Sequence, residues 1–141
     1  MPGLKASTRE PAPDLLRGCR VLVVDDEPDI LVLFDAVLSR CGATVLLADS
    51  ARAALARFNT EPIDAVVSDL SMPGEDGCWL AGELRRKMTD IGRVVPLLAV
   101  TAHGRHYPVH QAIAAGFTAY LGKPVDPDDL CESVARLLGR S

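Results

Sequence analysis

The sequence predicts an α/β domain built on one parallel, doubly wound sheet, and two observations lead to this fold class. First, five short apolar runs are continuously hydrophobic rather than alternating, which is typical of strands buried on both faces. Second, segments with helical periodicity separate these runs. Strands that alternate with helices imply right-handed βαβ units, with helices on both faces of the sheet. The predicted strands are 20–25, 43–49, 64–69, 94–101 and 118–123.

The first predicted helix has the clearest pattern. Its apolar positions recur at i, i+3, i+4 and i+7, Pro28 lies near its start, and Gly42 lies just past its end. A fourth helix is expected over 105–115, where Pro108 leaves the start undefined. The final helix follows the start signal "DPDD". The apolar faces are Ile30, Leu33, Phe34, Val37, Leu38 and Cys41 for the first helix, Ala54, Leu55 and Phe58 for the second, Leu80, Leu84 and Met88 for the third, and Leu130, Val134, Leu137 and Leu138 for the last.

The length of 141 residues fits a single domain. Residues 1–18 are rich in proline and scattered charge, which predicts a flexible arm or linker in which only Leu15 and Leu16 are suited to packing. The folded domain is expected over 19–141.

Composition excludes several classes of function. The formal charge is −4, and the densest basic cluster is Arg85–Lys87, so direct nucleic-acid binding is not expected. The four cysteines form no CxxC pair, which favours reduced packing residues in a cytoplasmic protein. No apolar run reaches the roughly 18 residues of a membrane span, and the N-terminus has no signal-peptide core.

Polar residues follow the predicted strands at the edge where ligands bind in open parallel sheets. They are Asp25 and Asp26 after the first strand, Asp69 at the end of the third, Thr101 at the end of the fourth, and Lys123 followed by Pro124 at the end of the fifth. One such aspartate alone is equally typical of a helix cap or turn. The complete set predicts a site.

The chemistry of this set is coherent. Three crowded carboxylates repel one another, and either protons or a cation must relieve that repulsion. Mg²⁺ is the expected ion, with Mn²⁺ as an alternative, because such hard ions prefer oxygen ligands. A lysine and a hydroxyl would meet the charge of a transferring phosphoryl group. The Asp69 carboxylate would then be the nucleophile that forms an aspartyl phosphate.

The fragments "VVDDEPD", "VSDLSMPGEDG", "VTAH" and "AYLGKP" together resemble the receiver domain of two-component response regulators, over about residues 19–139. The resemblance implies a flavodoxin-like (βα)5 sandwich with strand order 2-1-3-4-5. It also implies a phosphoacceptor domain, not an enzyme in the usual sense, that promotes its own aspartyl phosphorylation and dephosphorylation. Asp69 would receive the phosphoryl group from the phosphohistidine of a histidine kinase or a histidine phosphotransfer protein.

The resemblance also assigns roles to single residues. Asp26, Asp69 and the carbonyl of Ser71 would ligate the metal, and Asp25 would support it mainly through water. Lys123 would pair with the phosphoryl group, and its bond to Pro124 would be cis. Ser71 and His103 would lie at the rim of the site and tune the lifetime of the phosphoryl group.

A switch is implied as well. Thr101 would bond to the attached phosphoryl group, and Tyr120 would turn inward to fill the vacated space. The responsive face would comprise the fourth helix, the fifth strand and the fifth helix. Through this face the domain would regulate a downstream protein or self-associate.

Other interpretations are weaker. A dehalogenase-type phosphatase needs a second acid two residues after the nucleophile, where this chain has Ser71. No GxxxxGK[ST] or GxGxxG loop supports nucleotide chemistry. A histidine metal site at His106 and His110 has no strong further ligand. A degenerate receiver that only binds proteins would not need the complete acidic set.

The context of the domain is left open by the sequence. The initial Met is typical of a free-standing regulator, whereas "LLRGCRVLVVDDEPD" resembles the linker and start of a receiver in a hybrid histidine kinase.

Overall fold

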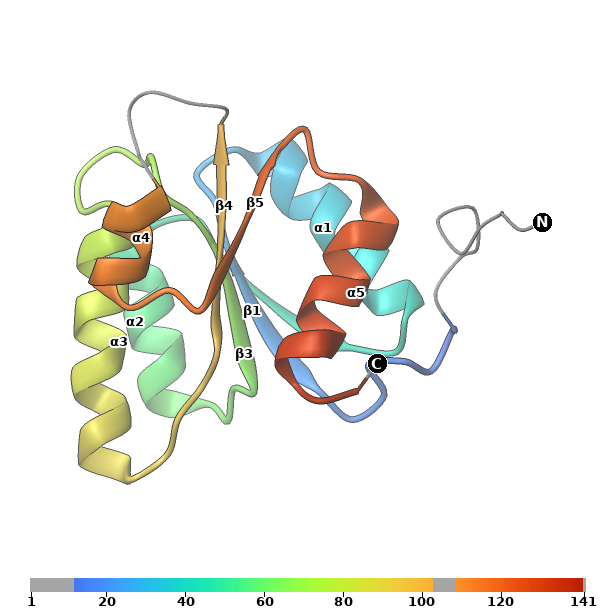
Figure 1. Ribbon diagram of the computed structural model, residues 1–141, viewed down its shortest axis with the longest axis horizontal. Helices are drawn as coiled ribbons and strands as arrows, with labels where there is room; N and C mark the ends of the chain where they lie inside the picture. The colour runs from blue at the N-terminus through green and yellow to red at the C-terminus, as the bar shows by residue number, and fades with distance from the viewer. Residues whose placement is uncertain (1–11, 103–108, 141) are drawn as a thin grey trace.

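The computed structural model describes residues 12–102 and 109–140, and these form alternating strands and helices around one sheet (Figure 1). The order of elements is β1 (Arg20–Val24), α1 (Pro28–Arg40), β2 (Thr44–Ala48), α2 (Ala51–Thr60), β3 (Ala65–Asp69), α3 (Gly77–Ile91), β4 (Leu97–Ala102), α4 (Val109–Ala115), β5 (Ala119–Lys123) and α5 (Pro127–Leu137). This alternation confirms the predicted fold class.

The sheet has the strand order β2-β1-β3-β4-β5, and all four pairings are parallel. Helices α1 and α5 cover one face, and α2, α3 and α4 cover the other (Figure 1). Each face therefore has its own apolar core, one centred on Leu22, Val66 and Leu97 and the other on Val21, Val23 and Val67. The strand order agrees with the one that the family resemblance implies.

The strand register explains why the polar residues meet. Val24 lies beside Ser68 in the pairing of β1 with β3, and Asp69 lies beside Val100 of β4. Ala102 in turn lies beside Lys123. The parallel strands thus end together, at the upper edge of the sheet in Figure 1, where the β4 arrowhead points.

Two expectations for the strands were wrong. Neither edge strand is buried on both faces. The residues of β5 alternate between half-buried and exposed, and β2 has an exposed Thr44 and half-buried Val45 and Leu47, because each of these strands pairs with only one neighbour. The fourth strand begins at Leu97 rather than at position 94, and Val94 is 79% exposed. Pro96 precedes the strand and has no N–H to donate to a sheet ladder, which accounts for the later start.

Several helix predictions are confirmed. Pro28 is the first residue of α1, and Gly42, just past its end, has a φ of +97°. Asp126 accepts hydrogen bonds from two backbone amides of the "DPDD" segment at the start of α5. The described part of the fourth helix begins at Val109, and positions 103–108 lie outside the described residues.

The described part of the predicted N-terminal arm, from residue 12, packs against the end of α1. Leu16 is fully buried, and its N–H donates to the carbonyl of Cys41 at 2.7 Å. A Cβ atom at Gly42 would lie 3.1 Å from the backbone nitrogen of Arg17, so the two segments are in close contact. Leu15 and Leu16 therefore pack as expected, and residues 1–11 lie outside the description.

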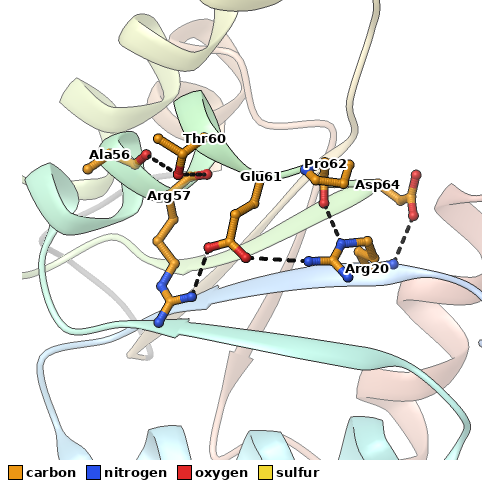
Figure 2. Close-up of polar contacts among 7 residues, drawn as sticks. All are labelled: Arg20, Ala56, Arg57, Thr60, Glu61, Pro62 and Asp64. Atoms are coloured by element: carbon orange, nitrogen blue, oxygen red, sulfur yellow. Dashed lines mark hydrogen bonds and ion pairs between the residues drawn. The ribbon is translucent and has the colours of Figure 1, made fainter.

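An ion-pair network lies at the other end of the strands, where β1 and β3 begin (Figure 2). The guanidinium of Arg20 donates to the carbonyl of Pro62 at 2.8 Å and lies 3.4 Å from the Glu61 carboxylate, which also pairs with Arg57. The backbone N–H of Arg20 donates to Asp64 at 2.8 Å. These contacts fix the α2–β3 connection to the start of β1.

None of the helices in the described part of the chain has the length and apolar character needed to span a membrane.

Candidate functional site: an acidic pocket at the sheet edge

Three aspartates at the carboxyl ends of two neighbouring strands, β1 and β3, form the centre of the site. Carboxylate oxygens of Asp25, Asp26 and Asp69 all lie within 4.8 Å of one another. Asp25 and Asp69 are buried, and Asp26 is the most solvent-open of the three. The predicted convergence of these side chains on one edge is therefore observed.

Lys123, at the end of β5, is the cation that faces this cluster. Its Nζ lies 3.1 Å from Oδ2 of Asp25 and 3.5 Å from Oδ2 of Asp69, and its side chain is 19% exposed. Burial by itself lowers the pKa of Lys123, but the two carboxylates outweigh that effect and the pKa is raised. Lys123 therefore remains charged and binds two of the three acids.

The Asp69 carboxylate is held at the end of a buried strand. Its Oδ1 accepts a hydrogen bond from the backbone N–H of Ser71 at 3.3 Å, and its backbone carbonyl accepts one from the Ser68 hydroxyl at 2.9 Å. Burial raises the pKa of Asp69 above its usual value, and the nearby Asp25 adds to this, whereas Lys123 and the Ser71 amide act in the opposite direction. Its carboxylate is thus a poorly solvated anion, which favours reaction with an electrophile.

The polar contacts of Asp25 already occupy both of its oxygens. Oδ1 accepts the backbone N–H of Glu27 at 2.9 Å, and Oδ2 pairs with Lys123. Both oxygens of Asp69 are contacted in the same way, Oδ1 by the Ser71 amide and Oδ2 by Lys123. Asp26 and Asp69 offer the hard, anionic oxygen donors that Mg²⁺ or Mn²⁺ prefers, so the residues present fit such an ion.

The turn after Asp69 is shaped by two glycines. Gly74 has a φ of +77°, which favours glycine. At Gly77 a Cβ would lie 2.4 Å from the carbonyl oxygen of Asp69 and 2.8 Å from the Cα of Leu70, so only glycine fits there. The Asp76 side chain caps α3 by accepting the Trp79 N–H at 2.8 Å. Gly77 is not among the predicted site residues, although the "DG" pair ahead of a helix was an available signal.

The remaining predicted residues lie around the pocket. Thr101 is half-buried and lies near the carboxyl end of β4. Its hydroxyl donates to the Ala102 carbonyl at 3.2 Å. Ser71 is exposed beside Asp69, and the Lys123–Pro124 peptide bond is cis, as the resemblance implies. Tyr120 on β5 is 48% exposed. His103, the other predicted rim residue, and His106 lie outside the described residues.

The strand order and the acidic pocket define a flavodoxin-like domain whose site lies at the carboxyl edge of its sheet. The chain belongs to the response regulator receiver domain family, whose profile matches residues 21–135. It is therefore a receiver domain of two-component signalling.

Relatives and solved structures agree with this assignment. The chain is 36% identical over 124 residues to the sensor histidine kinase GacS of Pseudomonas protegens, and 40% identical over 114 residues to an uncharacterised 14.6 kDa protein of Leptolyngbya boryana. A response regulator receiver domain protein from Clostridium thermocellum has a TM-score of 0.76 at 30% identity, covering 86% of this chain and 95% of that one. CheY4 of Vibrio cholerae has a TM-score of 0.78 at 28% identity, covering 85% and 98%.

The relatives differ greatly in length. The match covers 87% of this chain but 14% of GacS, and 89% of this chain but 27% of the transcriptional regulatory protein GlrR of Escherichia coli. With the Leptolyngbya boryana protein it covers 81% of this chain and 86% of the relative. Receivers similar to this chain thus occur both within long signalling proteins and in short chains.

Proposed function

We propose that Asp69 accepts a phosphoryl group from a phosphohistidine on a histidine kinase or a histidine phosphotransfer protein. The observation that carries this proposal is the buried Asp69 carboxylate, 3.5 Å from the Lys123 ammonium and within the acidic cluster. An Asp69 oxygen attacks the phosphorus, the P–N bond breaks, and the imidazole leaves with the electron pair and is protonated. The product is an aspartyl phosphate.

The residues around Asp69 would bind the phosphoryl group, hold the metal ion and control hydrolysis. Lys123 lies where it can pair with a phosphoryl oxygen, since its Nζ already contacts Asp69. Asp26, Asp69 and the Ser71 carbonyl would hold Mg²⁺ or Mn²⁺, with Asp25 supporting the ion through water. Such an ion would offset the negative charge that gathers on the phosphoryl oxygens. Ser71 and His103, the two predicted rim residues, are assigned to the control of hydrolysis.

A small phosphodonor tests the acceptor directly. After incubation with acetyl phosphate and Mg²⁺, the intact protein should gain about 80 Da, the mass of one phosphoryl group, and hydroxylamine should remove it. Chelation of the metal or the substitution Asp69→Asn should abolish the gain. Asp90→Asn, an exposed position on α3, is the matched control and should label normally. Hydroxylamine-sensitive labelling that persists in Asp69→Asn would refute the assignment.

An apolar groove beside Lys123 is the proposed docking place of the phosphodonor protein. The groove has a volume of about 350 Å³, and its continuity with the pocket through Lys123 would bring a docked phosphohistidine to Asp69. Its walls come from α1, the end of β4 and the β5–α5 connection. They comprise Ile30, Leu33, Phe34, Ala102, Lys123, Pro124 and Val125. Leu33→Asp should impair transfer from a phosphohistidine protein and spare labelling by acetyl phosphate.

The proposed output is a change in the face formed by α4, β5 and α5. Val109, Ile113 and Tyr120 expose apolar surface there, which suits binding of a downstream protein or a second copy of the chain. Phosphorylation would draw the Thr101 hydroxyl away from Ala102, and Tyr120 would turn inward. Beryllofluoride, which mimics the phosphoryl group, should therefore shift the amide resonances of α4 and β5; an unchanged spectrum there would contradict the switch.

A further inference from the structure

A pair of buried cysteines joins the two helices that cover one face of the sheet. Cys41 caps the C-terminal end of α1 and Cys131 lies within α5, 90 positions later. Their Sγ atoms are 2.9 Å apart. Both residues are buried, with Cys41 5% and Cys131 1% exposed. Because an S–S bond is about 2.05 Å long, the two sulfurs need to approach by less than about 1 Å to bond.

A small pocket reaches this pair from the surface. Its volume is about 100 Å³, enough for a small solute but not for a protein or a large reagent. It lies between the N-terminal segment, the end of α1 and the start of α5. The lining residues are Pro13, Val37, Arg40, Cys41, Pro127, Asp128 and Cys131.

We propose that Cys41 and Cys131 are an oxidisable dithiol that forms an intramolecular disulfide when hydrogen peroxide enters this pocket. The Cys41 sulfur attacks a peroxide oxygen, the O–O bond breaks, and water leaves, so that Cys41 becomes a sulfenic acid. The Cys131 sulfur then attacks the Cys41 sulfur, the S–O bond breaks, and a second water leaves. The two thiols are oxidised by two electrons, and the peroxide is reduced.

The surroundings of the two cysteines explain why they remain reduced thiols until an oxidant is present. Burial and the neighbouring Cys41 raise the pKa of Cys131, so Cys131 is a neutral thiol at physiological pH, and its attack on the oxidised Cys41 relies on the 2.9 Å separation of the two sulfurs. Oxidation therefore starts at the less buried Cys41, and the thiols remain reduced in the absence of an oxidant. Reversible disulfides of this kind are the usual redox-sensing form in reducing compartments.

The crosslink would connect two functional parts of the domain. The carbonyl of Cys41 accepts the hydrogen bond from Leu16, so Cys41 anchors the N-terminal segment. Cys131 lies in α5, part of the proposed output face. A disulfide would link α5 to the C-terminal end of α1, where the N-terminal segment packs, and would restrict movement of α5 relative to α1.

The test uses the full chain with Cys78→Ala, which removes the half-buried thiol that could link two molecules. Treatment with hydrogen peroxide should lower the intact mass by about 2 Da, and peptide mapping should join Cys41 to Cys131. The melting temperature should rise by roughly 5–15 °C, because the closed loop is long, and a reductant should reverse this. Adding Cys41→Ala should abolish the mass loss, whereas Cys19→Ala, at another buried thiol, should leave it intact.

Two results would overturn the proposal. One is a peroxide-treated chain whose thiols can all still be alkylated after unfolding. The other is a mapped disulfide that includes Cys19. Both measurements are made on chains that keep Cys41 and Cys131, so a folding defect in the Cys41→Ala variant would not obscure them.

Discussion

Removing the cation of the acidic pocket gives the most direct test of its electrostatics. Lys123→Met keeps much of the side-chain volume but leaves Asp25 and Asp69, both buried, without the ammonium that lies 3.1 and 3.5 Å away. Breaking a buried ion pair typically costs about 3–5 kcal/mol, and partial exposure of Lys123 favours the lower end. We expect the metal-free variant to lose about 3 kcal/mol of unfolding free energy at pH 7.

The loss should depend on pH in a definite direction. The pKa of Asp69 is already raised in the folded chain, and removal of Lys123 raises it further. The folded state therefore holds a proton that the unfolded state releases, so stability falls as pH rises through the range between the unfolded and folded pKa values. The raised pKa of Lys123 adds no slope below about pH 9, because this lysine is protonated in both states. The cost of Lys123→Met should therefore shrink as the pH is lowered from 8 into the range in which the folded chain binds a proton at Asp69.

Urea denaturation at several pH values measures this cost, with and without Mg²⁺. Because a divalent ion would take over part of the missing charge compensation, Mg²⁺ should stabilise the variant more than the parent. Lys87→Met removes a lysine from α3 and serves as the control, with an expected change within about 0.5 kcal/mol. A loss for Lys123→Met that equals the Lys87→Met value, or that does not vary with pH, would refute this account of the pocket.

Three further predictions concern the packing around the site. Gly77→Ala should cost about 2–4 kcal/mol in denaturant melts, because its Cβ would lie 2.4 Å from the Asp69 carbonyl, whereas Gly82→Ala, with open space at its Cβ, should be neutral or stabilising. Asp69→Asn should stabilise the metal-free chain at pH 7, as followed by thermal melting, because it removes a carboxylate whose pKa is raised by burial; the gain should shrink as pH falls through the range between the folded and unfolded pKa values of Asp69. Leu16→Ala should cost about 2–4 kcal/mol, because this side chain is fully buried; a loss below about 1 kcal/mol, or one no larger than that of Leu15→Ala, would mean that the N-terminal segment does not contribute to the core.

The fold was predictable because the apolar patterns are strong and local. The periodicity that ends at Cys41 defined α1, and the continuous runs around Val23 and Val67 defined the central strands. The burial of the fifth strand was not predictable in the same way. Its sequence is as apolar as that of a central strand, and only the strand order, which local patterns do not encode, makes it an edge.

The site was predictable as a set of residues but not as a network of contacts. Parallel strands end together, so the polar residues at their ends had to meet. One Asp25 oxygen accepts the Glu27 amide and the other pairs with Lys123. These contacts depend on backbone positions that are set by the whole fold. The close approach of Gly77 to Asp69 likewise depends on the path of the turn, which the letters "PGEDG" restrict without fixing.

The present hydrogen bond of Thr101 limits the free energy that this residue alone can contribute to the proposed switch. Its hydroxyl now bonds to the carbonyl of the next residue, a neutral bond worth about 0.5–1.5 kcal/mol, whereas a bond to a phosphoryl anion would be worth about 1.5–3 kcal/mol. The net gain of about 1 kcal/mol shifts a two-state equilibrium only about fivefold. A nearly complete change from one state to the other needs several times more free energy. The remainder must come from contacts that differ between the states, and the half-exposed Tyr120, together with Ile113 and Val109, has side-chain surface on that face that could still be buried. The proposed switch therefore depends on the packing of the α4–β5 surface at least as much as on the chemistry at Asp69.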